Sequence, residues 1–317
     1  MRIVFMGTPD FAVGTLQALV ESGKHEIAAV VTQPDRPKGR GQKMLMTPVK
    51  EYALSQGLPV YQPAKVKTPE VIAQLRELRP EIIVVAAFGQ LLNQELLALP
   101  PLGCVNVHAS LLPKYRGAAP IHYAILQGEK ESGVTIMQMG AGLDTGDMIS
   151  KIIVPLAADE TGGSLFDKLA EAGAKLLIAT LPHIFDGTAV YEKQPEESPT
   201  PYAGMITKQM GLMDFSKSAA ELERLVRGLN PWPSAFTFYN GKTLKVWESF
   251  VAESDDLNQA EPGTVVKADK KGIYVACGEG VLVLSQVQLE GKKRMDADAF
   301  LRGCRIEAGN RFADKKE

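Results

Sequence analysis

Ile82-Ile83-Val84-Val85-Ala86-Ala87 is the stretch that decides the fold. All of its residues are apolar, so it lacks the polar alternation of a strand with one face in water. Such a run predicts a strand covered on both faces, as in the middle of a parallel sheet. Around it we expect further strands at residues 3–6, 27–32, 60–62, 104–108, 134–139 and 148–154, and helices at residues 11–22, 49–56, 69–78 and 161–186. This alternation predicts a doubly wound α/β domain with a mostly parallel sheet.

The character of the sequence changes after a proline-rich segment. Residues 194–201 read Gln-Pro-Glu-Glu-Ser-Pro-Thr-Pro, which is typical of a polar, stiffened linker. Beyond it, residues 219–229 predict a helix, and short apolar runs predict about five strands, two of them joined by the hairpin signal Asn240-Gly241. A helix with five short strands predicts a small barrel of the OB type. We therefore expect an α/β domain at residues 1–190, a linker at 191–207 and an OB-like β-barrel domain at 208–317.

Length and composition agree with a globular protein of two domains. The chain has 317 residues, of which 45% are hydrophobic and 23% charged, so wholesale disorder and a fibrous repeat are excluded. Three distant cysteines without a CxxC pair predict neither a disulfide framework nor a zinc site, and they fit a reducing compartment. A membrane-spanning run of about 20 apolar residues and a signal-peptide pattern are both missing. We expect a cytoplasmic protein without membrane contact.

The charge distribution leaves the nature of the partner open. A net charge of −2 speaks at first sight against a nucleic-acid partner. Residues 34–50, however, contain five basic residues and one acid, Asp35. This segment is also rich in proline and glycine, and we expect it to be a loop up to about residue 48. It is either a solvated surface loop or a placed basic patch for an anionic partner.

The first strand leads into Gly7-Thr8-Pro9-Asp10-Phe11-Ala12. This turn lacks the second and third glycines that let a backbone approach a pyrophosphate, so a dinucleotide site is not predicted. Open α/β sheets bind ligands at the carboxyl ends of their strands. The turn is therefore either a substrate loop or simple turn chemistry.

Two polar stretches are candidates for catalysis. Asn106 and His108 alternate along one strand, so they share a face at its carboxyl end. Asp144 lies in the glycine-rich stretch 140–147, which cannot be a regular helix or strand. The functional interpretation is a loop that presents Asp144 to His108. The alternatives are polar side chains satisfied by nearby backbone and a flexible connection.

The order and spacing of these motifs resemble one known family. Asn106-x-His108, then Ser110-Leu-Leu-Pro113-x-Tyr-Arg-Gly117, then Asp144-Thr-Gly146 look like the folate-dependent formyltransferase superfamily. The opening 6–12, the loop 33–41 and the C-terminal β domain resemble the members of that family that act on methionyl-tRNA. The resemblance runs from end to end and covers every motif residue.

The resemblance implies both a reaction and its catalytic residues. The formyl group of 10-formyltetrahydrofolate, a co-substrate, would move to the α-amino group of methionine on initiator tRNA, for translation initiation. No metal would be needed, and nothing demands more than a monomer. Asn106 would donate a hydrogen bond to the developing oxyanion, His108 would act as general base, and Asp144 would orient His108 or relay a proton.

The resemblance also implies binding residues. The folate would lie against Ser110, Leu111, Leu112, Pro113, Phe88, Gly89, Gln90, Leu91, Leu92, Gly140, Ala141, Gly142 and Leu143. The methionyl end and the acceptor stem would contact Gly7, Thr8, Pro9, Phe11, Arg36, Lys38, Arg40 and Lys43. The C-terminal domain would hold tRNA.

Three other functions remain open on these residues. One is the same catalytic core with another amine acceptor, such as glycinamide ribonucleotide or a nucleotide sugar. Another is a hydrolase that gives the formyl group to water. The third is a non-catalytic RNA-binding protein, which would leave Asn106, His108 and Asp144 unexplained.

Overall fold

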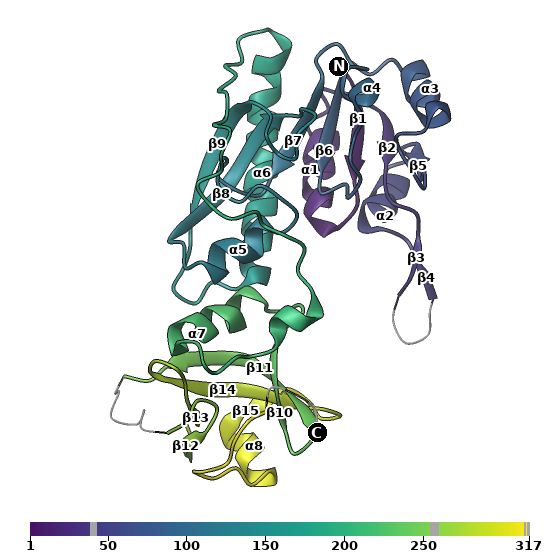
Figure 1. Cartoon of the computed structure of the whole chain (residues 1–317). Helices are drawn as coiled ribbons and strands as arrows, with labels where there is room; N and C mark the ends of the chain where they lie inside the picture. The colour runs from purple at the N-terminus through teal and green to yellow at the C-terminus, as the bar shows by residue number, and fades with distance from the viewer. Residues whose placement is uncertain (39–42, 254–259, 314, 316–317) are drawn as a thin grey trace. The chain divides into compact units, whose positions relative to one another are not determined.

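The structure is a computed structural model that describes residues 1–38, 43–253, 260–313 and 315. The chain forms two compact units (Figure 1). Unit 1 consists of Met1–Pro120, Glu131–Pro155 and Phe166–Ala203, and unit 2 of Ile121–Lys130, Leu156–Leu165 and Gly204–Glu317. In the described part of the chain, no helix combines the length and the apolar character that crossing a membrane requires.

Unit 1 is built on a seven-stranded sheet with the order β5-β2-β1-β6-β7-β8-β9. Its strands are β1 (Arg2–Gly7), β2 (Glu26–Val31), β5 (Val60–Tyr61), β6 (Ile82–Ala86), β7 (Cys104–His108), β8 (Glu131–Gln138) and β9 (Met148–Pro155). Neighbouring strands from β5 to β7 pair in parallel, whereas β8 is antiparallel to both of its neighbours, β7 and β9. The predicted mostly parallel sheet is confirmed. The chain moves outward from β1 to β2 and β5 and returns to β6 on the other side of β1, so the strand order reverses there.

Helices cover both faces of this sheet, which makes the domain doubly wound (Figure 1). On one face, α3 (Pro69–Glu77) and α4 (Gln94–Leu97) share an apolar cluster with alternate residues of β1 and β6, among them Met6 and Ile83. On the other face, α1 (Asp10–Glu21) contacts both α2 (Pro48–Ser55) and the edge of Phe166 in α6 (Gly162–Phe185). Every residue of β6 is buried, as its unbroken apolar sequence predicts.

The basic segment after β2 is not the simple loop that we expected. It contains two short antiparallel strands, β3 (Arg36–Lys38) and β4 (Lys43–Leu45), in which Arg36 pairs with Leu45. Pro37 hides this hairpin in the sequence, because a proline inside a short run argues against a strand. Arg40 lies outside the described residues, and the side chains of Lys38 and Lys43 are not described either.

Unit 2 contains the predicted helix and antiparallel strands. The sheet has the order β10-β11-β14-β13-β12, with β15 paired to β14. Its elements are α5 (Pro120–Leu126), α7 (Ala219–Gly228), β10 (Ala235–Tyr239), β11 (Lys242–Val251), β12 (Val265–Asp269), β13 (Gly272–Ala276), β14 (Val281–Leu289), β15 (Met295–Asp296) and α8 (Ala297–Gly303). Helix α7 begins with a capping box, in which Ser218 and Glu221 bond each other's backbone N–H groups. Asn240 and Gly241 both have positive φ, as a tight hairpin turn requires.

The five main strands of unit 2 do not close into a barrel by direct pairing in the part that the structure describes. Instead, the backbone of residues 309–313 bonds to both edges of the sheet. Ala313 exchanges hydrogen bonds with Phe238 in β10, and Val265 in β12 donates to Asn310. The irregular C-terminal segment therefore covers the exposed strand edges.

Candidate active site

The candidate site lies at the carboxyl ends of the central strands, where the strand order reverses. Side chains tie together the loops that follow three of these strands. The Thr8 hydroxyl donates to the Phe88 carbonyl oxygen at 3.0 Å, and the Gln33 side-chain amide donates to the same oxygen at 3.3 Å. Thr8 follows β1, Gln33 follows β2 and Phe88 follows β6. Through Thr8, the turn that follows β1 is thus bonded to the loop that follows β6.

Strand β7 places Asn106 and His108 on one face, as the alternation predicts. His108 is buried, with 6% of its side chain exposed, and its Nε2 lies 3.1 Å from the carbonyl oxygen of Tyr115. A carbonyl oxygen can only accept, so Nε2 carries the ring hydrogen. In the neutral ring, Nδ1 is therefore the nitrogen that can accept a proton. Asn106 is half-buried, and its amide makes no side-chain hydrogen bond within the described chain.

Asp144 lies beside His108, although 36 positions separate them in the sequence. Its Oδ2 is 3.8 Å from Nδ1 of His108, and 13% of its side chain is exposed. The backbone N–H of Gly117 donates to the same oxygen at 2.9 Å, which holds the carboxylate in place. A carboxylate at this position stabilises the imidazolium that forms when Nδ1 accepts a proton. The structure thus brings Asn106, His108 and Asp144 to one end of the sheet.

Tight backbone geometry shapes the loop that carries Asp144. Asp144 has φ +53°, a left-handed conformation that few residues adopt. A side chain at Gly146 would bring its Cβ to 1.8 Å from the carbonyl oxygen of Gln138, so only glycine fits there. The glycines in this stretch therefore permit a specific turn.

The loop after β7 is held by hydroxyl groups. Ser110 donates through its Oγ to the carbonyl oxygen of Lys114 at 2.6 Å. Thr135 donates to the Ser110 carbonyl oxygen at 2.7 Å and accepts from the N–H of Leu112 at 3.1 Å. Leu112 is buried against Met137 and Met148. Its side chain is a core residue, which leaves none of its apolar surface to cover a folate as the sequence suggested.

The other predicted folate residues differ in how accessible they are. The side chain of Phe88 is buried in the core, and the side-chain carbonyl oxygen of Gln90 accepts from the N–H of Val66 at 2.8 Å. Leu91 is 70% exposed, whereas Leu92 packs partly against the core. The stretch Gly140, Ala141, Gly142 and Leu143 is exposed, and Gly89, Leu111 and Pro113 are exposed or half-buried.

The predicted acceptor-binding residues divide in the same way. The Phe11 ring is buried against Phe166, and a Cβ on Gly7 would meet the Cβ of Ala12 at 2.6 Å, so both are needed for packing. Pro9 is the N-cap residue of α1. Arg36 is exposed on the hairpin.

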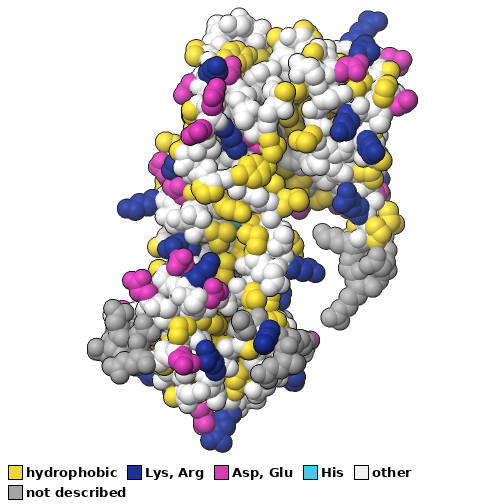
Figure 2. Space-filling view, viewed as in Figure 1, with side chains coloured by type: hydrophobic (Ala, Val, Ile, Leu, Met, Phe, Trp, Pro, Cys, Tyr) yellow, Lys and Arg dark blue, Asp and Glu magenta, His cyan; other side chains and the backbone are white. Residues whose placement is uncertain are grey.

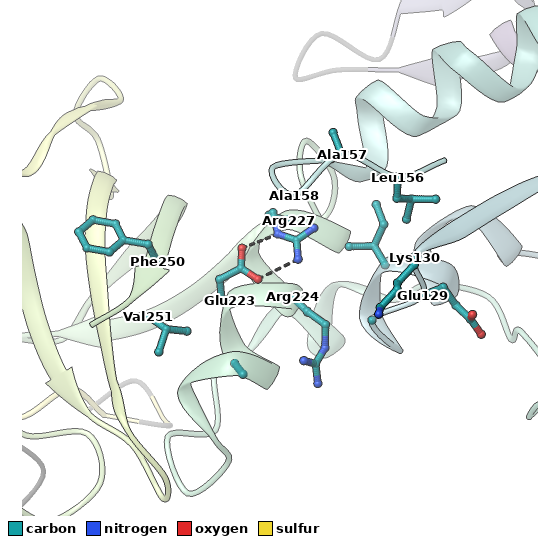
Figure 3. A pocket seen from close by; sticks show the side chains of 13 residues that line it. Glu129, Lys130, Leu156, Ala157, Ala158, Glu223, Arg224, Arg227, Phe250 and Val251 are labelled. Carbon is teal, nitrogen blue, oxygen red and sulfur yellow. Dashed lines mark hydrogen bonds and ion pairs between the residues drawn. The ribbon is translucent and has the colours of Figure 1, made fainter. Parts of the chain in front are cut away.

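The largest of the described cavities lies elsewhere, in unit 2. It has a volume of about 620 Å³ and contains none of the candidate catalytic residues; Arg224, Arg227 and Phe250 are among its lining residues (Figure 3). The described part of the chain also has no group of three or more His, Cys, Asp and Glu residues placed to hold a metal ion. Burial raises the pKa of Cys104 to about 12, which makes a thiolate nucleophile at that position unfavourable.

Two residues to which no role was assigned from their sequence pattern form a network behind the Asp144 loop: Gln194 bonds the backbone of the loop, and Arg116 bonds Gln194. Arg116 and Gln194 are both buried polar residues, and the Arg116 Nε donates to the Gln194 Oε1 at 3.0 Å. Gln194 opens the segment that the sequence indicated as a linker. No periodic pattern in the sequence marks Gln194 as buried, because its hydrogen-bond partners lie far away in the chain.

Comparisons with known proteins place this fold and site in a class. Residues 1–181 match the family described as formyl transferase, and residues 205–305 match its C-terminal domain. Fold and site together therefore define a formyl transferase. The methionyl-tRNA formyltransferase of Agathobacter rectalis is 56% identical over 98% of this chain and 99% of the relative. That of Bacillus subtilis is 53% identical over 98% of this chain and 96% of the relative. The chain belongs to the methionyl-tRNA formyltransferase family.

Solved structures share the same fold. The sugar 3N-formyl transferase WlaRD, in the presence of dTDP and 5-N-formyl-THF, has a TM-score of 0.65 at 20% identity, over 92% of this chain and 99% of that one. An N-formyltransferase from Helicobacter canadensis, in complex with folinic acid and dTDP-3-aminofucose, has a TM-score of 0.66 at 21% identity, over 89% of this chain and 98% of that one. At such identities the likeness extends to the fold alone.

Proposed function

We propose that this chain transfers the formyl group of 10-formyltetrahydrofolate to the α-amino group of methionyl initiator tRNA. The product, N-formylmethionyl-tRNA, starts translation, and the cytoplasm is the proposed location of the enzyme. The observation that carries the proposal is that relatives named methionyl-tRNA formyltransferase align with this chain over nearly the full length of both. The grouping of Asn106, His108 and Asp144 supplies the chemistry.

In the proposed mechanism, the uncharged α-amine attacks the formyl carbon. A carbon–nitrogen bond forms to methionine while the bond from the formyl carbon to the folate nitrogen breaks. The proton leaves the amine for Nδ1 of His108, directly or through a water molecule, and the Asp144 carboxylate stabilises the resulting imidazolium. The imidazolium then gives this proton to the departing folate nitrogen, which restores neutral His108. The Asn106 amide, which has no partner in the described chain, donates to the formyl oxygen as negative charge develops on it.

The proposed folate site uses the loops on either side of these residues. Leu91 and Leu143 expose apolar side chains, which suit the face of a planar ring, while the exposed backbone at Gly89 and Gly140–Gly142 can bond its polar edge. The residues present thus fit a pterin. When bound, the folate supplies the activated formyl group, and the chain orients it toward the amine.

The proposed tRNA contacts depend on placed charge. Among the described residues on the face drawn in Figure 2, Lys and Arg side chains are scattered between Asp and Glu and form no continuous basic surface. The hairpin β3–β4 combines basic residues with the exposed apolar side chains Met44, Leu45 and Met46. Contacts to phosphate and 2′-hydroxyl groups need positive charge more than a base code. Arg36, Lys38, Arg40 and Lys43 are therefore the proposed contacts to the acceptor stem.

One assay separates this proposal from its alternatives. The protein is incubated with labelled 10-formyltetrahydrofolate and with methionyl initiator tRNA, a small amine acceptor or no acceptor. Transfer to the tRNA alone supports the proposal, and transfer to a small amine indicates another member of the family. Formate release without an acceptor indicates a hydrolase, whereas no reaction with any acceptor leaves only a binding protein.

A further inference from the structure

A buried hydrogen-bond network connects the proline-rich segment 194–196 to the loop that carries Asp144. The side-chain nitrogen of Gln194 donates to the carbonyl oxygens of Asp144 at 2.9 Å and Gly146 at 2.7 Å. Only 6% of Gln194 is exposed. A single side-chain amide thus fixes the backbone on both sides of Thr145.

Arg116 fixes Gln194 in turn. Its Nε donates to the side-chain oxygen of Gln194, and its two terminal nitrogens donate to the carbonyl oxygens of Glu196 at 3.0 Å and Pro195 at 2.7 Å. Because the guanidinium nitrogens are occupied in three directions and the residue is buried, Gln194 has one orientation in which all its polar atoms are satisfied. The amide nitrogen must then face the Asp144 loop.

The same short stretch of backbone reaches both catalytic side chains. Tyr115, just before Arg116, accepts from His108, and Gly117, just after it, donates to the Asp144 carboxylate. Arg116 therefore lies between the two residues that bond the catalytic side chains. The Tyr115 carbonyl oxygen orients the His108 imidazole, and the Gly117 N–H holds the Asp144 carboxylate. Gln194 closes the arrangement from the other side of the loop.

We propose that Gln194 is a positioning residue for formyl transfer, which holds the Asp144 carboxylate beside Nδ1 of His108. It contacts no reacting atom and acts through the backbone of residues 144–146. The expected loss of kcat rests on the proposed function, whereas the expected release of the Asp144 loop does not. Loss of the two donated hydrogen bonds releases the loop and weakens the bond from Gly117 to Asp144.

The test uses two substitutions with different consequences in the full-length protein. Gln194→Met keeps the length of the side chain and removes all its hydrogen bonds. Gln194→Glu keeps the acceptor for Arg116 but replaces the donor by an oxygen that faces two carbonyl oxygens. Gln74→Met, on the exposed surface of α3, is the matched control. The measurements are kcat and KM for each substrate, and hydrogen–deuterium exchange at the amide of Gly117.

We expect both Gln194 variants to lose at least about tenfold in kcat, with KM values within about twofold of wild type, since the lost interactions act on orientation and not on substrate contacts. Exchange at Gly117 should be faster in both. When Asp144 is already replaced by asparagine, adding Gln194→Met should lower kcat by less than about a further twofold. The reason is that the effects of residues that act as a unit are not additive.

Two results would overturn the inference. One is unchanged hydrogen–deuterium exchange at Gly117 in both variants. The other is a loss of kcat from Gln194→Met that is equally large in the wild-type protein and in the Asp144→Asn background. Should the wild-type protein transfer no formyl group to methionyl-tRNA while exchange at Gly117 still increases in the variants, the proposed function fails and the positioning role stands. The two failures are therefore distinguishable.

Discussion

Replacement of Asp144 by asparagine tests the proposed proton transfer most directly. The substitution keeps the size of the side chain and an oxygen that can accept from Gly117, but it removes the negative charge. The charge matters only when His108 holds the transferred proton. The Asp144→Asn variant should therefore bind both substrates normally and react slowly.

The geometry gives a magnitude for this loss. The carboxylate oxygen is 3.8 Å from Nδ1, and only 13% of the Asp144 side chain is exposed. With an effective dielectric constant of roughly 20, the attraction between imidazolium and carboxylate at this distance is about 4 kcal/mol. A barrier raised by that amount slows the reaction by about three powers of ten, and residual orientation by asparagine reduces this to a loss of roughly 10²–10³ in kcat.

The assay is transfer of labelled formyl groups to methionyl initiator tRNA under saturating substrates, with Asp147→Asn as the control. Asp147 lies in the same loop and loses the same charge, but its side chain makes no hydrogen bond or ion pair within the described chain. We expect the control to keep its kcat within about twofold. If Asp144→Asn also keeps its kcat within about threefold, the carboxylate does not stabilise a protonated His108, and the reasoning from Nδ1 is wrong.

Three further predictions address the other parts of the site. Asn106→Ala should lose roughly 10²–10³ in kcat with little change in KM, as expected for removal of one oxyanion donor, and steady-state kinetics will show a rise in KM instead if Asn106 only binds substrate. Arg40→Ala combined with Lys43→Ala should weaken tRNA binding and lower the slope of log K against log salt by about 0.7–0.9 for each phosphate that the variant no longer neutralises, while folate binding is spared. Wild-type behaviour of this double variant at moderate salt would identify the basic segment as an ordinary surface loop. The pKa of Asp35 is lowered by hydrogen bonds from Lys50 and Gln62, so its ionised form stabilises the fold above the unfolded pKa of ~3.9, and this contribution is lost as the pH falls through the lower folded pKa. Asp35→Asn should therefore reduce the free energy of unfolding at pH 7 by about 1 kcal/mol or less, which lowers Tm slightly. A Tm difference between variant and wild type that persisted at pH 2 would show that the ionised Asp35 carboxylate is not its cause.

Periodic features could be predicted from the sequence because each of them follows from a local pattern. The run at residues 82–87 has no polar position, and a strand of that kind is stable only when both faces are covered. Likewise, Asn240 and Gly241 determine a turn by their own backbone preferences. The placement of Asn106 and His108 on one face also needs only the period of a strand.

Contacts between distant segments could not be predicted in this way. The residues alone left the approach of Asp144 to His108 as one of several alternatives, and only the resemblance to a family favoured it. Leu112 shows a different limit, since a leucine in a loop after a strand can face a ligand or the core, and the core cluster with Met137 and Met148 decides the outcome. The hairpin at β3 and β4 was hidden by Pro37, which is unfavourable in a strand in general but tolerated in a two-stranded ribbon with free edges.

Gln194 illustrates why composition was misleading for the segment before unit 2. Prolines and acidic residues around it are typical of a solvated connection, yet Gln194 is buried and Pro195 and Glu196 accept hydrogen bonds from Arg116. The reason is that Arg116 itself lies in the interior, and a buried guanidinium requires acceptors in several directions. A proline-rich chain supplies such acceptors well, because its carbonyl groups are not used in helix or sheet bonding. The same sequence that reads as a linker is thus suited to line the back of a catalytic loop, and only the burial of Arg116 tells the two uses apart.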